Sequence, residues 1–230
     1  MSTVAIIPAR GGSKGIPRKN LVPVAGKPLL AWSILQALAA DTIESVWVSS
    51  DDEEILDIAI GYGASPILRP SELSSDDATS ESAWIHSINF IEARGQSVSC
   101  VVGMQPTSPL RSPEDLDKAV RLFKGGDFDS IFSAVEVEDF FMWRPEAENG
   151  ARPINYDFKT RQRRQNIEKR YLENGSFYIF SPKLLRAQNN RLGGKIGMSL
   201  MEKYKMFQID NIEDVPLCGV LLTGFGLDKF

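Results

Sequence analysis

The chain has little of the chemistry on which many enzyme classes depend, since its 230 residues include one histidine, His86, and two cysteines, Cys100 and Cys218. The single histidine lies among apolar neighbours on a predicted helix, and nothing pairs it with a nucleophile, which excludes a Ser-His-Asp hydrolase. No Cys/His spacing indicates a zinc site. Both cysteines stand in apolar surroundings, so we expect reduced core residues in a cytoplasmic protein.

Long hydrophobic runs and an excess of positive charge are also lacking. No window approaches the roughly 18 apolar residues of a membrane span, and the opening MSTVAIIPAR does not have the order of a signal peptide, so we expect no membrane association. The formal net charge of −4 gives no electrostatic case for a nucleic-acid partner. A hydrophobic content of 43% and this length suit one large globular domain.

Apolar runs alternate with segments of helical periodicity along the first part of the chain. Strands are predicted at 4–7, 45–50, 65–68, 99–105 and 129–137, and helices at 28–39, 53–63, 79–93 and 112–123. This order predicts an α/β fold with a mainly parallel sheet and helices on both faces. Ligands of such sheets bind beyond the carboxyl ends of the strands, where the first loop falls.

The periodicity fails between residues 138 and 172 and resumes with a strand pattern at NGSFYIF. The segment holds a basic run, KTRQRRQNIEKR, which is read mainly as a solvated face. It also holds four large apolar side chains that need burial: Phe140, Phe141, Met142 and Trp143. We predict an insertion that packs on a second subunit, and the alternative is a lid that folds on its own subunit.

The loop after the first predicted strand, PARGGSKGIPRKN (8–20), mixes glycines with cations. Gly11 and Gly12 let the backbone approach a ligand and leave N–H groups for an anion. Four cations that could neutralise a polyphosphate are interleaved with the glycines: Arg10, Lys14, Arg18 and Lys19. The loop is neither a P-loop nor a dinucleotide fingerprint, because both motifs are missing from it. A solvated surface turn is the alternative, which the interleaved cations disfavour.

The chain resembles the acylneuraminate cytidylyltransferases, or CMP-sialic acid synthetases, in five segments that follow the family's order. They are PARGGSKGIPRKN (8–20), ILRPSELSSDDATS (67–80), QPTSPLR (105–111), ENGSFYIF (173–180) and QIDNIEDV (208–215). The resemblance implies a Rossmann-like nucleotidyltransferase domain over 1–230, with the insertion exchanged as an arm across a homodimer. Members couple CTP to a nine-carbon keto-sugar acid and release pyrophosphate.

The resemblance is less specific to one sugar than to the family. N-acetylneuraminate is the first expected substrate, and legionaminate, pseudaminate and Kdo are the alternatives. From another functional class, the chain could be an inactive relative that binds nucleotide as a scaffold or regulator.

The resemblance also implies a nucleotide site, made by Ala9, Arg10, Gly11, Gly12, Ser13, Lys14, Lys19, Asn20, Arg69, Ala78 and Ser80. Arg10, Lys14, Lys19 and Asp210 are expected to be catalytic, since nucleotidyl transfer depends on positioning and charge neutralisation. For Arg69 the alternative is a charged loop residue. Asp76 and Asp77 are expected to cap the following helix, and Arg18 is read as a surface residue.

Four residues are expected by resemblance to contact the sugar acid: Gln105, Arg164, Asn174 and Tyr178. A guanidinium at Arg164 fits the sugar carboxylate in a bidentate manner, and in an exchanged arm it would serve the neighbouring subunit's site. Asn174 and the following glycine could instead form only a turn. The segment RLGGKIG (191–197) is expected beside the sugar.

Transfer from a polyphosphate indicates Mg²⁺ as the cofactor, held by one or two carboxylates together with phosphate oxygens. Where the family has two aspartates one residue apart, this chain has Gln208 and Asp210. The resemblance therefore implies one Mg²⁺ ion on Asp210 and leaves a second ion open, because Gln208 offers only a neutral oxygen.

Overall fold

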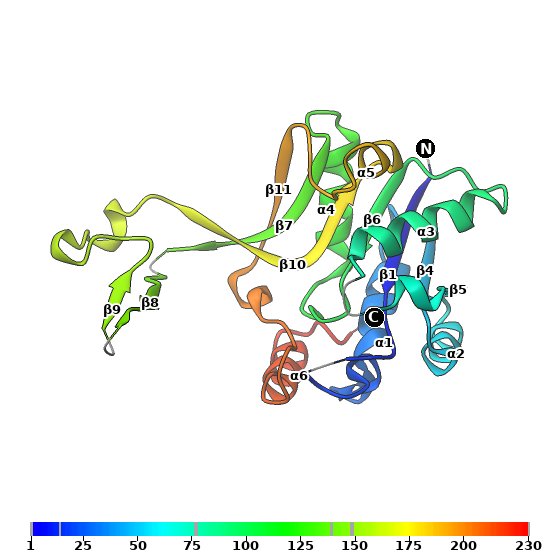
Figure 1. Ribbon diagram of the computed structural model, residues 1–230, viewed down its shortest axis with the longest axis horizontal. Helices are drawn as coiled ribbons and strands as arrows, with labels where there is room; N and C mark the ends of the chain where they lie inside the picture. The colour runs from blue at the N-terminus through cyan, green and yellow to red at the C-terminus, as the bar shows by residue number, and fades with distance from the viewer. Residues whose placement is uncertain (1, 14, 76–77, 139, 148–149, 230) are drawn as a thin grey trace.

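The computed structural model describes residues 2–13, 15–75, 78–138, 140–147 and 150–229, which form a seven-stranded sheet flanked by helices (Figure 1). The sheet strands are β1 (Thr3–Pro8), β4 (Ser45–Ser50), β5 (Ser65–Leu68), β6 (Cys100–Met104), β7 (Ser130–Val137), β10 (Arg170–Phe180) and β11 (Ile196–Met201). The helices are α1 (Leu29–Leu38), α2 (Glu53–Gly61), α3 (Ser80–Glu92), α4 (Pro113–Lys124), α5 (Pro182–Gln188) and α6 (Asp214–Gly224). Two small hairpins pair β2 (Pro23–Val24) with β3 (Lys27–Pro28) and β8 (Trp143–Pro145) with β9 (Ala151–Pro153). Short 3₁₀ turns span Lys19–Leu21, Ser71–Leu73, Phe158–Thr160, Arg164–Asn166 and Lys203–Met206.

The strand order in the sheet is β11-β7-β10-β6-β1-β4-β5. Every neighbouring pair is parallel except the two that involve β10, which runs antiparallel to β6 and β7. The predicted mainly parallel sheet is therefore confirmed, and the predicted strands and helices all occur close to their expected bounds. In the described part of the chain, no helix combines the length and apolar character needed to cross a bilayer.

Alternating side chains of β1 divide the core into two layers. Ala5 and Ile7 face the layer of α1, α2 and α4, whereas Val4 and Ile6 face the layer of α3 and α5. All four side chains are fully buried, and burying a Val or Ile side chain contributes about 1.5–3 kcal/mol. With helices on both faces, the loops that follow the parallel strands meet at one edge of the sheet.

Polar side chains cap the starts of α2, α3, α4 and α5. Asp52 accepts a hydrogen bond from the N–H of Ile55 at the start of α2, at 3.2 Å. A box formed by Ser112 and Asp115 caps α4. Thr79 caps α3 by accepting from the N–H of Ser82 at 3.2 Å. Asp76 and Asp77, which were expected to provide this cap, lie outside the described residues.

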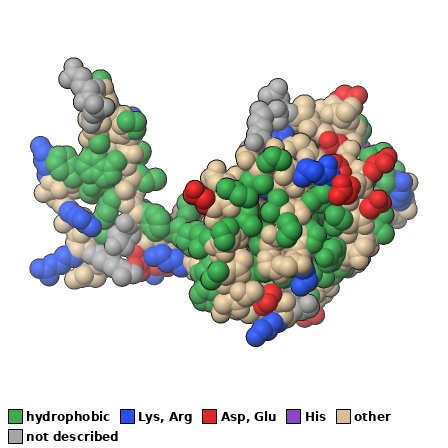
Figure 2. All heavy atoms as spheres, turned by 90° about the horizontal axis from the view of Figure 1, so that it is seen from below, with side chains coloured by type: hydrophobic (Ala, Val, Ile, Leu, Met, Phe, Trp, Pro, Cys, Tyr) green, Lys and Arg blue, Asp and Glu red, His purple; other side chains and the backbone are tan. Residues whose placement is uncertain are grey.

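The segment between β7 and β10 leaves the sheet and projects as an arm (138–172), to the left in Figure 1. Its described residues do not fold over the sheet as a lid would. Figure 2 shows apolar side chains gathered on the arm. Those that are 45–57% exposed include Phe140, Met142, Trp143, Ile154 and Phe158. Only part of the aromatic surface is covered within the arm, for example where Phe141 packs on Tyr156 with ring centroids 4.3 Å apart.

Candidate active site

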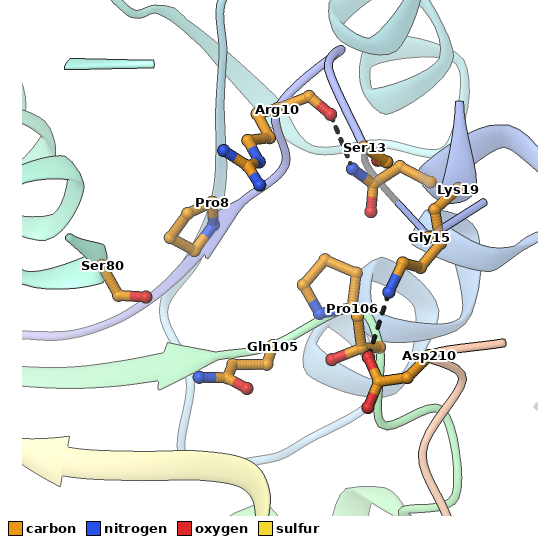
Figure 3. A pocket seen from close by; sticks show the side chains of 11 residues that line it. Pro8, Arg10, Ser13, Gly15, Lys19, Ser80, Gln105, Pro106 and Asp210 are labelled. Carbon is orange, nitrogen blue, oxygen red and sulfur yellow. Dashed lines mark hydrogen bonds and ion pairs between the residues drawn. The ribbon is translucent and has the colours of Figure 1, made fainter. Parts of the chain in front are cut away.

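A cleft of about 440 Å³ opens at the carboxyl ends of β1 and β6 (Figure 3). It is lined by Pro8, Arg10, Ser13, Gly15, Lys19, Asn20, Ser80, Gln105, Pro106, Thr107 and Asp210. A second hollow of about 280 Å³ shares three of these residues and is lined by Pro8, Arg10, Arg69, Leu73, Ser74, Ser75, Ala78, Thr79 and Ser80. Four of the five segments that the sequence singled out therefore meet at one place of a size suited to a small molecule.

Polar contacts with neighbouring segments hold the first loop in place. The side-chain amide of Asn20 donates to the carbonyl of Arg10 at 3.0 Å, and the Arg10 guanidinium donates to the carbonyl of Ser75 at 3.3 Å. The N–H of Gly11, which we expected to face an anion, instead donates to Asp51 at 3.1 Å. A Cβ at Gly11 would lie 2.7 Å from a carboxylate oxygen of Asp52, so a larger residue here would force the cap of α2 to shift.

The remaining predicted residues of this loop divide into those inside and those outside the cleft. Ser13 lines it, whereas Gly12 is exposed and does not. The methyl group of Ala9 is buried in the core, and its N–H donates to the carbonyl of Ser49 at 2.9 Å. Lys14 lies outside the described residues.

Lys19 and Asp210 come together across the cleft from opposite ends of the sequence. The Lys19 ammonium donates to the carbonyl of Ile209 at 3.0 Å and lies 3.1 Å from a carboxylate oxygen of Asp210. A Cβ at Gly15 would lie 2.7 Å from the carbonyl oxygen of Asp210, so this glycine permits the close approach. The side chain of Lys19 is only 14% exposed, which restricts where its charge can point.

Asp210, the predicted metal ligand, lies at the cleft with few acidic neighbours. The described residues contain no group of three or more His, Cys, Asp or Glu side chains that could hold a metal ion. Asp214 accepts from the N–H groups of Asp210 and Asn211 at 2.9 and 2.7 Å, and Gln208 donates to the carbonyl of Asn174 at 2.7 Å. The Asp210 carboxylate is 65% exposed and pairs with Lys19, and its role as a Mg²⁺ ligand together with phosphate oxygens stays a prediction.

Arg69 lines the second hollow and is 6% exposed. Burial lowers the pKa of its guanidinium, while Asp51, 3.9 Å away, raises that pKa and Arg10 lowers it. Its Nε is buried and has no hydrogen-bond partner among the residues that the structure describes. A buried N–H of this kind stabilises a ligand that brings an acceptor atom. Arg10, Ala78 and Ser80 line the same hollow, so four of the predicted nucleotide residues lie together.

The predicted sugar contacts are placed less uniformly. Gln105 follows β6 and lines the cleft. Asn174 is 1% exposed, and its side chain donates to the carbonyl of Lys205 at 2.9 Å. In the structure this side chain therefore contacts other residues of the protein and not the cleft. The side chain of Arg164 lies outside what the structure describes. The sugar contacts of Asn174 and Arg164 stay predictions.

Tyr178 is nearly buried, and its hydroxyl donates to Glu173. Burial and this hydrogen bond raise the pKa of Tyr178, so its hydroxyl stays protonated. The Arg191 guanidinium lies 4.6 Å from the centroid of the Tyr178 ring and binds Glu81 at 2.8 Å. Because Glu81 follows Ser80, the start of segment 191–197 is tied to the helix that borders the cleft. The sugar contact of Tyr178 itself stays a prediction.

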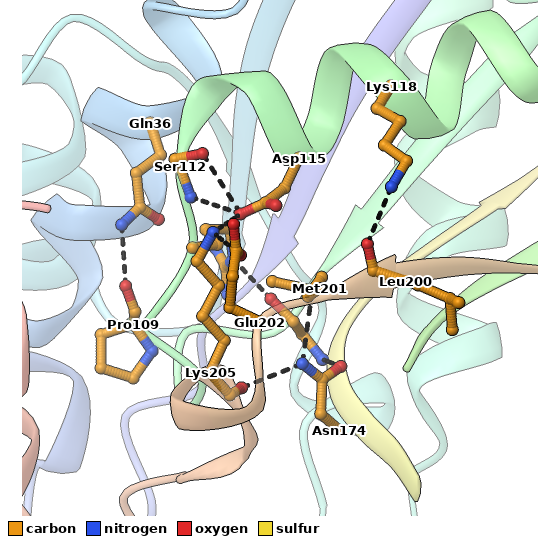
Figure 4. Close-up of polar contacts among 12 residues, drawn as sticks. Gln36, Pro109, Ser112, Asp115, Lys118, Asn174, Leu200, Met201, Glu202 and Lys205 are labelled. Atoms are coloured by element: carbon orange, nitrogen blue, oxygen red, sulfur yellow. Dashed lines mark hydrogen bonds and ion pairs between the residues drawn. The ribbon is translucent and has the colours of Figure 1, made fainter. Parts of the chain in front are cut away.

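A buried ion pair that the sequence did not reveal lies behind the cleft (Figure 4). The Lys205 ammonium is 2.7 Å from Asp115 and 2.6 Å from Glu202, and the Lys205 side chain is 3% exposed. Burial lowers the pKa of Lys205, but the two carboxylates outweigh it and the net shift is upward. Since Asn174 donates to the Lys205 carbonyl, this pair supports the strand that carries Asn174.

Comparison with known proteins identifies similar sequences over nearly the whole chain. The family model described as cytidylyltransferase matches residues 4–216. N-acylneuraminate cytidylyltransferase A of Danio rerio is 38% identical over 232 aligned positions, which cover 98% of this chain and 52% of the relative. The pseudaminic acid cytidylyltransferase of Campylobacter jejuni is 31% identical, and 96% of each chain is covered. The chain thus spans about half the length of the fish relative and nearly all of the bacterial one.

Solved structures with much lower sequence identity share the fold. CMP:2-keto-3-deoxy-manno-octonic acid synthetase, solved with CTP, superposes with a TM-score of 0.70 at 13% identity, over 100% of both chains. A 4-diphosphocytidyl-2C-methyl-D-erythritol synthase superposes with a TM-score of 0.70 at 11% identity, over 96% of this chain and 99% of the other.

Proposed function

We propose a function on the premise that this chain belongs to the cytidylyltransferase family. The proposed reaction transfers CMP from CTP to the anomeric hydroxyl of a nine-carbon keto-sugar acid and releases pyrophosphate. The observation that carries it is the convergence of Arg10, Lys19, Gln105 and Asp210 on one cleft beside the hollow of Arg69. That arrangement offers cations for a triphosphate, an amide for a polar co-substrate and a carboxylate for a divalent ion.

In the proposed step the anomeric hydroxyl oxygen bonds to the α-phosphorus of CTP. The bond from that phosphorus to the bridging oxygen breaks, pyrophosphate carries the electron pair away, and the hydroxyl proton passes to solvent. Arg10 and Lys19, which line the cleft, would stabilise the charge that grows on the leaving oxygens. Mg²⁺, held by Asp210, would neutralise further phosphate charge. Arg69 would donate hydrogen bonds to the pyrimidine in the second hollow.

The preferred sugar acid is N-acetylneuraminate, which the 38% identity to the Danio rerio enzyme supports. Pseudaminate and legionaminate are the alternatives, supported by 31% identity to the pseudaminic acid enzyme and by 43% identity over 129 residues to a CMP-N,N'-diacetyllegionaminic acid synthase of Legionella pneumophila. The similarity in fold to the Kdo enzyme keeps Kdo as a further alternative.

The arm supports a proposed homodimer, because its exposed aromatic side chains need a surface to cover them. In such a dimer Arg164 would reach the partner's cleft and bind the sugar carboxylate. Mixing an Arg164→Ala variant with a Lys19→Ala variant should then restore part of the activity, since each hybrid dimer would contain one intact site. No restoration would contradict a shared site.

The direct test measures pyrophosphate release from CTP and Mg²⁺ with a panel of keto-sugar acids. We expect release with at least one nine-carbon acid and the highest kcat/KM with N-acetylneuraminate. The second candidate function is a nucleotide-binding scaffold, which is favoured by the neutral Gln208 and its bond to Asn174. CTP binding without pyrophosphate release for any acid in the panel would support the scaffold and contradict the enzyme.

A further inference from the structure

Arg111, the last residue of QPTSPLR, is completely buried directly behind the cleft. Its guanidinium donates to side-chain oxygens of Ser176 on β10 at 2.8 Å and Ser33 on α1 at 2.9 Å. The remaining nitrogen donates to the carbonyls of Gln105, at 2.7 Å, and Ser108. One planar group thus joins a strand, a helix and both ends of a four-residue turn.

Burying the charged guanidinium of Arg111 costs free energy, and the need to fill space in the core does not explain why an arginine stands here. Among the described residues, no carboxylate lies within ion-pair distance of its guanidinium, and all four acceptors are neutral oxygens. Burial lowers the pKa of Arg111 to about 9, while Asp115 raises it, so the group is still charged at pH 7. An apolar side chain of similar volume would fill this space without that cost. A guanidinium differs by offering several N–H donors in a fixed plane.

The turn that Arg111 binds is the floor of the cleft. Gln105, Pro106 and Thr107 line the cleft, and the Thr107 carbonyl accepts the N–H of Ile209 at 2.7 Å. Ile209 precedes Asp210, so the turn links the amide expected at the sugar to the carboxylate expected at the metal. A shift of the turn would move both groups relative to the phosphate clamp.

We propose that Arg111 is a positioning residue that holds the Gln105–Ser108 turn in the geometry needed for transfer to the sugar acid. This inference rests on the proposed function for its effect on activity, but the constraint on the turn can be measured without activity. The cations that bind CTP in our proposal come from other segments: Arg10 and Lys19 at the triphosphate, and Arg69 at the pyrimidine. Loss of the guanidinium should therefore affect the sugar acid more than CTP.

The test variant is Arg111→Lys, which keeps a charge but loses the planar fork. We expect kcat/KM for the sugar acid to fall at least tenfold, while the KM for CTP changes by less than about threefold. In hydrogen exchange, the amides of Ser108 and Ile209 should exchange at least tenfold faster. The matched control is Asp117→Asn, a buried carboxylate that binds Thr42 away from the cleft at 2.6 and 2.8 Å. It should leave both readouts near wild type.

Two milder variants keep the test decisive if Arg111→Lys does not fold. Ser176→Ala and Ser33→Ala each remove one acceptor of the fork, and each should lower kcat/KM for the sugar acid about threefold or more. Unchanged exchange at the turn in the folded variants would overturn the inference, as would an equal loss of kcat/KM in Asp117→Asn. A wild-type protein that releases no pyrophosphate would overturn the proposed function instead, and faster exchange in Arg111→Lys would still support the positioning role.

Discussion

Replacing Lys19 with methionine removes the best-defined cation of the cleft while keeping a side chain of similar length. Its ammonium is held at 3.0 Å from the carbonyl of Ile209 and 3.1 Å from the carboxylate of Asp210. If Lys19 stabilises the phosphate charge of the transition state, its loss should cost about 3 kcal/mol there, which corresponds to roughly a hundredfold lower kcat/KM.

The same substitution should have a small effect on folding. Asp210 is 65% exposed, and ion pairs with a solvated partner typically contribute about 1 kcal/mol or less. The loss of turnover and the change in the free energy of unfolding, measured together, therefore separate a catalytic role from a structural one. We expect turnover to fall about a hundredfold while the free energy of unfolding falls by no more than about 1 kcal/mol.

Pyrophosphate release with CTP and the best sugar acid measures the first quantity, and urea unfolding measures the second. Lys118→Met is a matched control, because the Lys118 ammonium also donates to a backbone carbonyl, that of Leu200 at 3.1 Å, but outside the cleft. It should keep activity near wild type. Activity of Lys19→Met within threefold of wild type would refute the assignment, and so would an equal loss in the control.

Three further predictions concern the metal, the arm and the buried ion pair. Asp210→Asn should raise the Mg²⁺ concentration for half-maximal pyrophosphate release at least tenfold, and an unchanged Mg²⁺ titration would contradict its role as metal ligand. Trp143→Asp combined with Phe158→Asp should convert a dimer into a monomer in light scattering, and a monomeric wild-type protein would remove the basis of the proposed interface. Lys205→Met leaves Asp115 buried without its cation and should lower the free energy of unfolding by about 3 kcal/mol at pH 7. Because the folded-state pKa of Lys205 is raised, its stabilisation is fully present below the unfolded value of about 10.4 and is lost as pH rises through the folded value. Urea unfolding of both proteins at pH 7 and pH 11 should therefore show a smaller difference at the higher pH.

The alternating pattern of short apolar runs and helical segments predicted the sheet. Strands that are buried on both faces of a sheet are continuous runs of apolar residues, which can be recognised in a short stretch of sequence. Gln105 was likewise predictable, since a polar residue directly after a buried strand lies at the sheet edge where ligands bind. An insertion at 138–172 was predicted from its lack of periodicity and its large apolar residues, and its exchange across a dimer stays a prediction. Its extension away from the sheet was not predicted, because the same apolar residues could also have covered a lid.

The structure shows contacts between distant segments that the sequence did not predict. The Gly11 amide was expected to bind an anion, but Asp51 lies 40 residues further along the chain and accepts its hydrogen bond. Asn174 was expected at the sugar, yet its side chain is buried against Lys205. No local pattern distinguishes an amide that faces a ligand from one that faces a neighbouring loop.

The sequence by itself determined the order of strands and helices and the identity of the cation-rich loop, because these depend on periodicity and residue type over short spans. Only the tertiary structure decided which charged side chains line the cleft. It also decided which ones, like Arg111 and Lys205, are buried behind the cleft and bind the segments that form it. The physical reason is that a buried charge is tolerated only where several distant segments supply partners in the right geometry. That geometry exists only after the chain has folded.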